Sequence, residues 1–145
     1  MAEQGLTVAV TGPTGDVGRP FIRALERSKL IGRIRGMARR PFDPAAHGWK
    51  RTEYVQGDIL DRDAVEAFVA GADVVVHLAF VIFGGLEESR KINLEGSRNV
   101  FEAAVGAGAK RLVYASSVAA YGFHDDNPEL LTEEVPPRGT DAFYY

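Results

Sequence analysis

The segment TVAVTGPTGDVGRP, residues 7–20, constrains the fold of this chain more than any other part of it. A short apolar run passes directly into a stretch of helical periodicity through Gly12, Gly15 and Gly18. The first glycine permits a tight turn after a strand, the second lets backbone approach a pyrophosphate, and the third allows a helix to pack closely on a sheet. The expected contacts of this turn with a dinucleotide are Gly12, Thr14, Gly15, Asp16, Val17 and Gly18. The spacing is GxxGxxG, and a glycine turn without a ligand is the alternative.

Short apolar runs alternate with longer stretches of helical periodicity, which is typical of βαβ units and predicts an α/β fold with a doubly wound parallel sheet. The runs VVVHLA and RLVYA lack a polar alternate face, so they predict central strands. After Gly122 the chain holds three of its seven prolines, which predicts a loop. The expected strands are Leu6–Val10, Ile34–Met37, Tyr54–Val55, Asp73–Leu78 and Arg111–Ala115. The expected helices run from Val17 to a stop at Gly32, over Ala64–Ala70 after an N-cap at Asp61 and before Gly71, and over Glu88–Ala107.

Length and composition predict one domain over residues 1–145, since 46% of the residues are hydrophobic and 26% are charged. The chain has no cysteine and three dispersed histidines, so we expect no metal site. A net charge of −3 favours neither nucleic acid nor an anionic membrane as a partner. No apolar run approaches the roughly 20 residues that span a bilayer, and Glu3 stands where a secretory signal would be basic. We therefore expect a cytoplasmic location.

The end of the second expected strand reads GMARRP, and it bears on the choice of cofactor. In a dinucleotide-binding unit an acid at this place binds the ribose diol of NAD. Here Arg39 and Arg40 offer two guanidinium groups, which suit bidentate contact with a 2′-phosphate. The sequence therefore predicts NADP(H) in preference to NAD(H). A solvated basic edge is the alternative, because Arg33 and Arg35 extend the same run.

Four further motifs, VQGDILD, DVVVHLA, INLEGSRNV and YASSVAAYG, follow the glycine turn in order. With them the chain resembles the extended short-chain dehydrogenase/reductases, the NAD(P)-dependent epimerase/dehydratase group, from Leu6 to Tyr145. The resemblance implies a Rossmann sheet of strand order 3-2-1-4-5 that stops before the later strands and the substrate domain. It implies that Asp58, with Ile59, contacts the adenine, although turn formation before Asp61 is an equal alternative for Asp58. It also places Leu78 and Ala79 beside the cofactor.

The resemblance implies catalytic roles for Asn93, which supports the active-site backbone or proton pathway, and for Ser117, which holds the reacting oxygen. Ser116 is expected beside the cofactor, and Ser117 as a helix cap is the alternative. Tyr145, 28 residues after Ser117, is at about the distance of the family tyrosine, with Tyr144 as the second choice. These enzymes pair that tyrosine with a lysine in YxxxK, and no YxxxK occurs within the 145 residues. His77 is interpreted as a structural residue of its strand.

The sequence leaves three alternative functions. The first is an enzyme, or its N-terminal part, that moves hydride between NADP(H) and a small-molecule carbonyl or secondary alcohol, with Phe80–Phe83 as a weakly polar wall. The second is a dinucleotide-binding module without catalysis, and the third, disfavoured for want of a nucleophile elbow, is a serine hydrolase using Ser117, His124 and Asp125. The resemblance also implies a possible homodimer through the helix Glu88–Ala107. An exposed fifth strand predicts self-association.

Overall fold

A parallel sheet forms the centre of the structure, a computed structural model that describes residues 5–82 and 85–140. The strand order is β3-β2-β1-β4-β5, and each neighbouring pair is parallel. The predicted doubly wound α/β fold and its strand order are confirmed. The strands are β1 Leu6–Thr11, β2 Ile31–Ala38, β3 Thr52–Gln56, β4 Val74–His77 and β5 Arg111–Tyr114.

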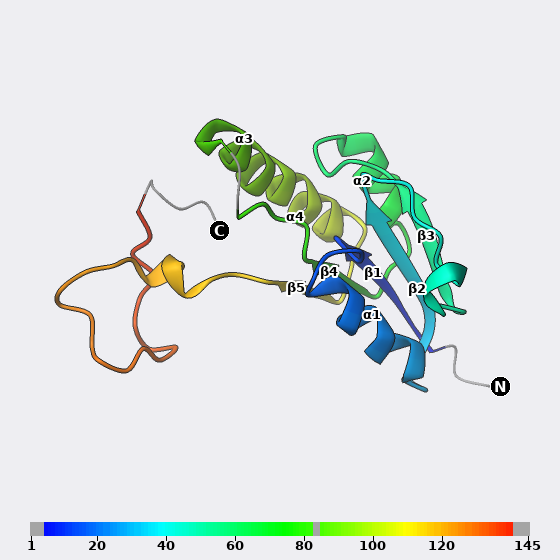
Figure 1. The fold of residues 1–145 in the computed structure, drawn as a ribbon, viewed down its shortest axis with the longest axis horizontal. Helices are drawn as coiled ribbons and strands as arrows, with labels where there is room; N and C mark the ends of the chain where they lie inside the picture. The colour runs from blue at the N-terminus through cyan, green and yellow to red at the C-terminus, as the bar shows by residue number, and fades with distance from the viewer. Residues whose placement is uncertain (1–4, 83–84, 141–145) are drawn as a thin grey trace.

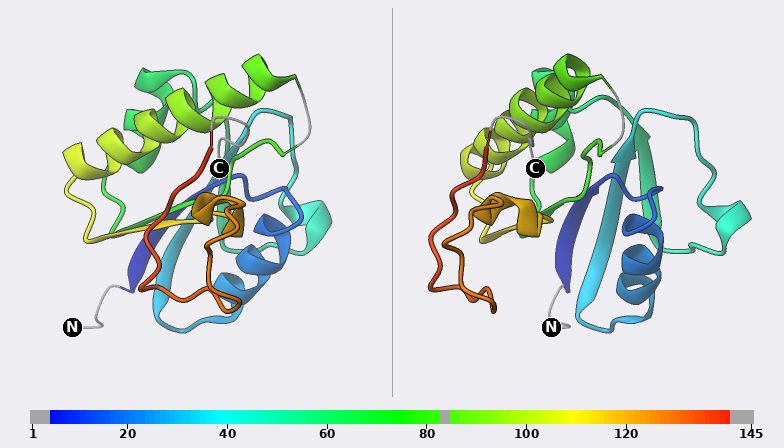
Figure 2. Two further views of the ribbon diagram at one scale, coloured as in Figure 1. Left: turned by 90° about the vertical axis from the view of Figure 1, so that its left-hand side faces the viewer. Right: turned by 60° about the vertical axis from the view of Figure 1, so that its left-hand side comes forward.

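Helices cover both faces of the sheet (Figure 1; Figure 2). Helix α1, Gly18–Arg27, lies on one face, and α2, Arg62–Val69, and α4, Ser97–Gly106, lie on the other. Helix α3, Leu86–Arg90, and the π-helical turn η2, Lys91–Gly96, lead without a break into α4. Two short 3₁₀ turns, η1 at Ala45–His47 and η3 at Val118–Tyr121, were not expected from the sequence. Among the described helices none is long and apolar enough to cross a membrane.

The hydrophobic core is divided by the sheet, because neighbouring residues of a strand face opposite sides. On the side of α1, the strand residues Val8, Val10, Ile34 and Val76 pack with Ile22. On the side of α2 and α4, a second cluster joins the strands to both helices, and its fully buried members include Ala9, Phe68, Val69, Val75 and Val100. Central strands that are covered on both faces read as continuous apolar runs, which explains the pattern of VVVH in β4.

Several boundaries differ from the sequence prediction, and tertiary contacts give the reasons. Helix α1 ends at Arg27, and Gly32, expected to end it, lies within β2. A Cβ on Gly32 would lie 2.6 Å from the carbonyl oxygen of Gly5, so close strand packing requires a glycine there. The strand β5, whose apolar run RLVYA resembles that of a central strand, is an edge strand in the described part of the chain, as the expected strand order and the expected exposed fifth strand require. Its Leu112 and Val113 are 37% and 44% exposed.

Helix α2 begins after the N-cap that the sequence predicted. Asp61 is the N-cap, and its Oδ1 accepts a hydrogen bond from the Ala64 N–H at 3.1 Å. Gly71, with φ of +73°, follows the helix. The predicted boundaries of α2 are correct to within two residues, because its cap and its stop are both local signals.

The described segment after Gly122 has no helix or strand, as predicted, and it stands away from the sheet (Figure 1, orange to red). Arg138 closes it into a loop. The Arg138 guanidinium donates to Asp126 at 2.9 and 3.0 Å and to Asn127 at 2.7 Å. The Arg138 carbonyl accepts a hydrogen bond from the His124 ring at 2.8 Å, so the two ends of the loop meet. The loop is therefore held together by its own residues.

Candidate functional site

A cavity of about 330 Å³ opens where the carboxyl ends of the strands meet. In a doubly wound sheet this edge binds ligands at the point where the strand order reverses, which here lies between β1 and β4. The loops after β1, β2, β3 and β4 supply most of its walls, and η2 supplies one more residue. The lining residues are Gly12, Thr14, Gly15, Met37, Ala38, Arg39, Arg40, Gly57, Asp58, Ile59, Leu78, Ala79, Phe80, Val81 and Ile92.

Most of the residues that the sequence assigned to a cofactor meet in this cavity. From four separate stretches of chain the structure brings together Gly12, Thr14, Gly15, Arg39, Arg40, Asp58, Ile59, Leu78 and Ala79. The other four assigned residues, Asp16, Val17, Gly18 and Ser116, are not part of its lining. Gly18 is buried behind the turn, and Ser116 is exposed after β5.

The turn after β1 is packed so closely that two of its three glycines have no room for a side chain. Gly12 has φ of +71°, and a Cβ there would lie 2.8 Å from the carbonyl of Leu78. A Cβ on Gly18 would lie 2.1 Å from the carbonyl oxygen of Gly12, so α1 begins directly against the turn. At Gly15 the nearest atom to a Cβ would be 3.6 Å away. A Cβ at Gly15 would therefore make only an ordinary van der Waals contact, and Gly15 lies on the wall of the cavity.

The start of α1 presents backbone donors that the described part of the chain does not use. The Gly15 N–H is already used, because it donates to the carbonyl of Gly12 at 3.3 Å. The N–H groups of Asp16, Val17 and Gly18 have no acceptor among the described residues. They lie at the positive end of the α1 dipole, which favours an anionic group such as a pyrophosphate.

The backbone of Arg39 and Arg40 is fixed from the neighbouring strand β3. The Tyr54 hydroxyl donates to the carbonyls of Ala38, at 3.0 Å, and of Arg40. The Gln56 side-chain amide donates to the carbonyl of Arg39 at 3.0 Å. Both guanidinium side chains are exposed and have no carboxylate partner within the described residues. The loop is held in place while its two positive charges stay available.

The other two arginines of this basic run are already occupied. Arg33 forms a two-pronged ion pair with Glu53, with distances of 2.8 and 2.9 Å, and that pair lowers the pKa of the Glu53 carboxyl. Arg35 donates to the carbonyls of Ala67 and Ala70 at the end of α2. Arg39 and Arg40 therefore differ from Arg33 and Arg35, because only the first two lie at the cavity without a carboxylate partner in the described chain.

The structure shows the turn-forming role of Asp58, which was one of the two alternatives that the sequence left open. Its Oδ1 accepts the Leu60 N–H at 3.0 Å, and its carbonyl accepts the Asp61 N–H at 3.0 Å, so it forms the turn before α2. It also lines the cavity, together with Ile59. The turn fixes the carboxylate close to the adenosine side of a doubly wound site.

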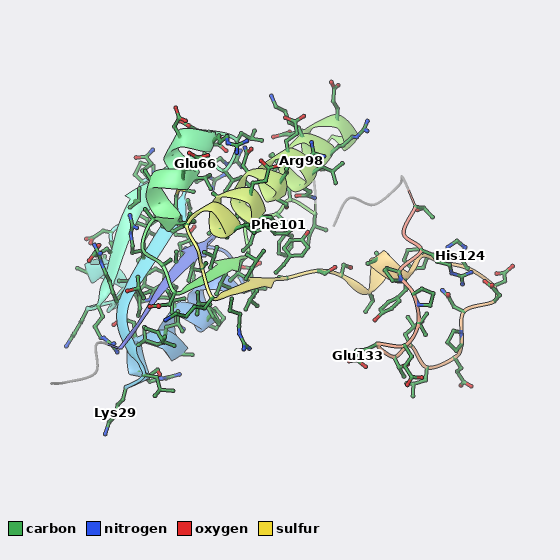
Figure 3. The ribbon with its side chains drawn as sticks, turned by 180° about the vertical axis from the view of Figure 1, so that it is seen from behind. Lys29, Glu66, Arg98, Phe101, His124 and Glu133 are labelled. Atoms are coloured by element: carbon green, nitrogen blue, oxygen red, sulfur yellow. The ribbon has the colours of Figure 1, made fainter. Side chains whose placement is uncertain are left out.

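His77 is a structural residue of β4, as expected. Its Nδ1 lies 2.6 Å from the Thr11 hydroxyl and its Nε2 lies 3.0 Å from the Ser97 hydroxyl, so both ring nitrogens have partners. The ring stacks on Tyr114 and meets the edge of Phe101, which Figure 3 shows below α4. Burial lowers the pKa of His77 to about 4, so the ring is neutral at pH 7. It links β1, β4 and α4 beneath the cavity.

Asn93 holds the segment that follows β4. Its side-chain oxygen accepts the Val81 N–H at 2.8 Å, and its nitrogen donates to the Val81 carbonyl at 2.8 Å. The side chain is buried in the π-helical turn η2, and such turns often occur at functional sites. Asn93 therefore supports backbone at the cavity wall.

Ser117, the other predicted catalytic residue that the structure describes, does not line the cavity. The Ser117 hydroxyl accepts the Ala119 N–H at 3.2 Å and caps η3, which was the alternative to its catalytic role. Tyr145, like Tyr144, lies outside the described residues. The His124 ring is bonded to the Arg138 carbonyl in the loop, and no hydrogen bond within the described chain links it to Ser117. The arrangement needed for a serine hydrolase is therefore not formed.

Several lining residues were missed by sequence reasoning. Met37, Ala38, Gly57 and Ile92 reach the cavity because they end strands or cover it from η2. A Cβ on Gly57 would lie 2.8 Å from the Met37 sulfur, so the Met37 side chain occupies the space beside this glycine where β2 and β3 end together. The signal for the first three was available, since every residue at the carboxyl end of a parallel strand is a candidate.

The sheet, the glycine turn and the cavity at the switch in strand order define a doubly wound protein with a nucleotide-type site. Comparison with known proteins gives the particular family. The NAD dependent epimerase/dehydratase family matches residues 8–144, and the chain belongs to that family.

Two curated relatives illustrate the match. Human 3 beta-hydroxysteroid dehydrogenase type 7 is 35% identical over 132 residues, which cover 82% of this chain and 34% of that protein. The ceramide reductase of Caulobacter vibrioides is 39% identical over 116 residues, which cover 78% of this chain and 35% of that protein. The chain thus spans about a third of the length of these relatives.

A solved structure shows the same arrangement of elements. The uronate dehydrogenase from Agrobacterium tumefaciens has a TM-score of 0.78 and 34% identity, over 94% of this chain and 49% of that one. A mutant of the same dehydrogenase, with a TM-score of 0.77 to this chain, is complexed with NAD.

Proposed function

We propose that this chain forms the cofactor-binding part of an oxidoreductase that prefers NADP(H) and moves hydride to or from a carbonyl or secondary alcohol. Membership of the family supports the dinucleotide. The names of the relatives, a hydroxysteroid dehydrogenase, a ceramide reductase and a uronate dehydrogenase, support hydride transfer.

The observation that carries the preference for NADP(H) is the pair Arg39 and Arg40 at the cavity. No acid stands at the end of β2, where the ribose diol of NAD is bound in this fold. Both side chains are exposed without a carboxylate partner among the described residues, and the backbone between them is held by Tyr54 and Gln56. A 2′-phosphate offers a guanidinium two or more charge-assisted hydrogen bonds.

The remainder of the cavity fits the rest of a dinucleotide. The unused N–H groups of Asp16, Val17 and Gly18 suit a pyrophosphate, and the lack of a side chain at Gly15, on the cavity wall, permits close approach to the backbone. Asp58 and Ile59 lie on the adenosine side, and Leu78 and Ala79 lie where the fold passes to its second half. When bound, the nicotinamide supplies or accepts hydride.

The chain's own residues are proposed to hold the substrate oxygen and to exchange its proton. Ser117 holds the reacting oxygen, Tyr145 exchanges its proton, and Asn93 keeps the adjacent backbone in place. The Asn93 contacts with Val81 support the last of these roles. Phe80 and Val81 add an apolar wall to the cavity, which favours a substrate with apolar surface beside the reacting carbon. The substrate is a small molecule.

Cofactor titration tests this proposal. NADPH and NADH are titrated separately into the full chain while the fluorescence of the reduced nicotinamide is followed, and we expect tighter binding of NADPH. Arg39→Asp with Arg40→Asp removes the charge-assisted bonds and supplies an acid, so we expect a loss of roughly a hundredfold for NADPH and little loss for NADH.

The matched control makes the same change of charge away from the cavity. Arg23→Glu with Lys29→Glu alters two exposed residues without a described partner, and Figure 3 shows Lys29 projecting from the far end of the molecule. We expect this control to keep the preference for NADPH. Equal affinity for both cofactors in the unaltered chain would contradict the preference. Binding of either cofactor without turnover of any carbonyl or alcohol would favour the non-catalytic alternative.

A further inference from the structure

Two asparagines in the continuous segment of η2 and α4 form hydrogen bonds to the backbone of two residues of the cavity wall. Asn93 in η2 holds Val81, as described above. Asn99, in α4, donates its side-chain nitrogen to the carbonyl of Ile59 at 2.9 Å. Asparagine is unfavourable within a helix by propensity, so a polar contact at such a position has a local reason. For Asn99 that reason is a backbone carbonyl on the adenosine side of the cavity.

The side chain of Ile59 is held by the same helical run. It is 6% exposed, and it packs against Gly96, where a Cβ would lie 2.5 Å from the Ile59 Cδ1. Gly96 and Asn99 are three residues apart and therefore neighbours on the helix surface. One of them receives the side chain of Ile59, and the other holds its carbonyl. Backbone and side chain of this wall residue are thus both fixed.

The position of Ile59 in the cavity determines what this contact controls. Ile59 follows β3, on the same side as Arg39 and Arg40, while Val81 follows β4 on the other side of the switch in strand order. A doubly wound site binds the adenosine half on the first side and the nicotinamide half on the second. The two asparagines therefore serve different halves of the same site.

We propose that Asn99 is a positioning residue for the adenosine half of the dinucleotide. Through Ile59 it sets the wall against which the adenine lies, and it touches no ligand itself. Gly96 contributes to the same positioning, because its lack of a side chain leaves the space that the Ile59 side chain occupies. The inference rests on the proposed binding of a dinucleotide, but it does not depend on the preference between NADP(H) and NAD(H).

Displacement by half-cofactors tests the proposal. The full chain is loaded with whichever reduced cofactor it binds more tightly, and AMP and nicotinamide mononucleotide are used separately to displace it. Asn99→Asp replaces the donor with an acceptor that faces the Ile59 carbonyl, so the wall loses its anchor. We expect the affinity for AMP to fall roughly tenfold. We expect the affinity for nicotinamide mononucleotide to change by less than about twofold.

A control on the same helix separates this effect from general damage to α4. Glu102→Gln removes the 2.9 Å ion pair between Glu102 and Arg62, which also joins α4 to α2 but lies outside the cavity. We expect it to leave both displacement curves unchanged. Urea unfolding of each variant checks that it is folded.

Gly96→Ala tests the same wall independently. The added methyl displaces the end of the Ile59 side chain, which is flexible, so the chain is expected to fold and to show the same selective loss for AMP. Ile59→Val removes the Cδ1 atom, which would lie 2.5 Å from the added methyl, and leaves the Cγ1 atom at 2.7 Å, so combining the two substitutions should recover only part of the affinity lost in Gly96→Ala.

Three outcomes would overturn the proposal. A folded Asn99→Asp chain with unchanged affinity for AMP shows that the contact positions nothing. Equal losses for AMP and nicotinamide mononucleotide show a general structural role. Should Asn99→Asp fail to fold, Gly96→Ala decides the matter by the same two criteria. Absence of binding by either cofactor to the unaltered chain rejects the proposed function and this inference together, whereas the other outcomes leave dinucleotide binding intact.

Discussion

At the end of the sheet where the strands begin, the carboxylates of Asp73 and Glu26 have partners within the chain, whereas at the end where the strands finish, two arginines and several backbone donors have none among the described residues. At the first end, Asp73 accepts the Thr7 N–H at 2.9 Å and pairs with Lys110 at 2.9 Å. Glu26 accepts hydrogen bonds from the backbone of Lys50 and Arg51 and from the Thr52 hydroxyl. At the second end, the N–H groups that start α1 and the double arginine lack partners among the described residues.

The difference separates an end where polar groups are satisfied within the chain from an end where polar groups are available to a ligand. The Thr7 N–H and the Lys110 ammonium lower the pKa of Asp73, so this carboxylate is stabilised by folding. Burial of Glu26 raises its pKa, but the hydrogen bonds from Thr52, Arg51 and Lys50 outweigh burial, and the pKa is lowered. The hydrogen bonds of Asp73 and Glu26 are thus made within the chain. Groups without partners are the ones that a ligand is able to use.

The largest effect is expected at the turn after β1, at the end where the strands finish. Gly18→Ala places a methyl group 2.1 Å from the carbonyl oxygen of Gly12 and 2.6 Å from the backbone of Pro13. The helix and the turn cannot both keep their positions, so we expect a loss of about 4 kcal/mol in the free energy of unfolding, together with loss of cofactor binding. Urea unfolding and cofactor titration measure the two effects.

Gly106→Ala is the matched control, because a Cβ there meets no atom within 4 Å. It lies in the last turn of α4, where alanine is a better helix former, so we expect a gain of up to about 1 kcal/mol. A Gly18→Ala chain as stable as the unaltered one would mean that the turn is not closely packed, and the comparison between the two ends would lose its main support.

The second effect is a dependence of stability on pH caused by His77. Its pKa is about 4 in the folded chain and 6.5 as its ordinary value, so as the pH falls through 6.5 the unfolded chain binds a proton that the folded chain does not. The free energy of unfolding should therefore decrease between pH 6.5 and 4, by about 3 kcal/mol in total. Urea unfolding at a series of pH values measures the decrease.

His77→Gln is the control for this pH dependence, since glutamine keeps a donor and an acceptor but does not titrate. We expect a shallower decrease for the variant over the same range. Identical slopes for the two proteins would exclude His77 as the origin. The contribution of Glu26 is separate, because its lowered pKa places the loss of stability below pH 4.5.

The smallest effect is expected at the end where the strands begin. Glu26→Gln puts a donor opposite the backbone N–H groups of Lys50 and Arg51, so we expect a loss of about 1 to 2 kcal/mol in the free energy of unfolding. Cofactor affinity should stay the same, because Glu26 lies at the opposite end of the sheet from the cavity. Weaker cofactor binding in a folded Glu26→Gln chain would show that the two ends are not independent.

The arrangement of the elements followed from the sequence because its signals are local. Glycine spacing, a capping Asp61 and unbroken apolar runs each act within a few residues, and the chain alternates them regularly. The errors arose where distant residues decide the conformation. Gly32 reads as a helix stop, but its contact with Gly5 makes it part of β2, and β2 begins at Ile31 for the same reason.

The candidate site was predicted where residues end a strand, and it was missed where residues approach from another layer. Arg39, Arg40 and Asp58 were found because the carboxyl ends of parallel strands converge. Asn99 was not found, since its contact with Ile59 spans 40 positions and nothing near it in the sequence announces a partner. Ser117 was assigned by resemblance alone, and the described structure shows its hydroxyl as a cap.

The loop between Gly122 and Arg138 is closed by contacts at its two ends, so its length can change without moving the sheet. A Cβ on Gly122 would lie 2.3 Å from the Arg138 carbonyl oxygen, so the chain leaves the body and returns at nearly the same point. Residues added at the exposed Leu130 would lengthen only the excursion, because the contacts that close it are made by its ends. The segment is therefore a natural place to insert a peptide tag or a reporter domain without disturbing the cavity.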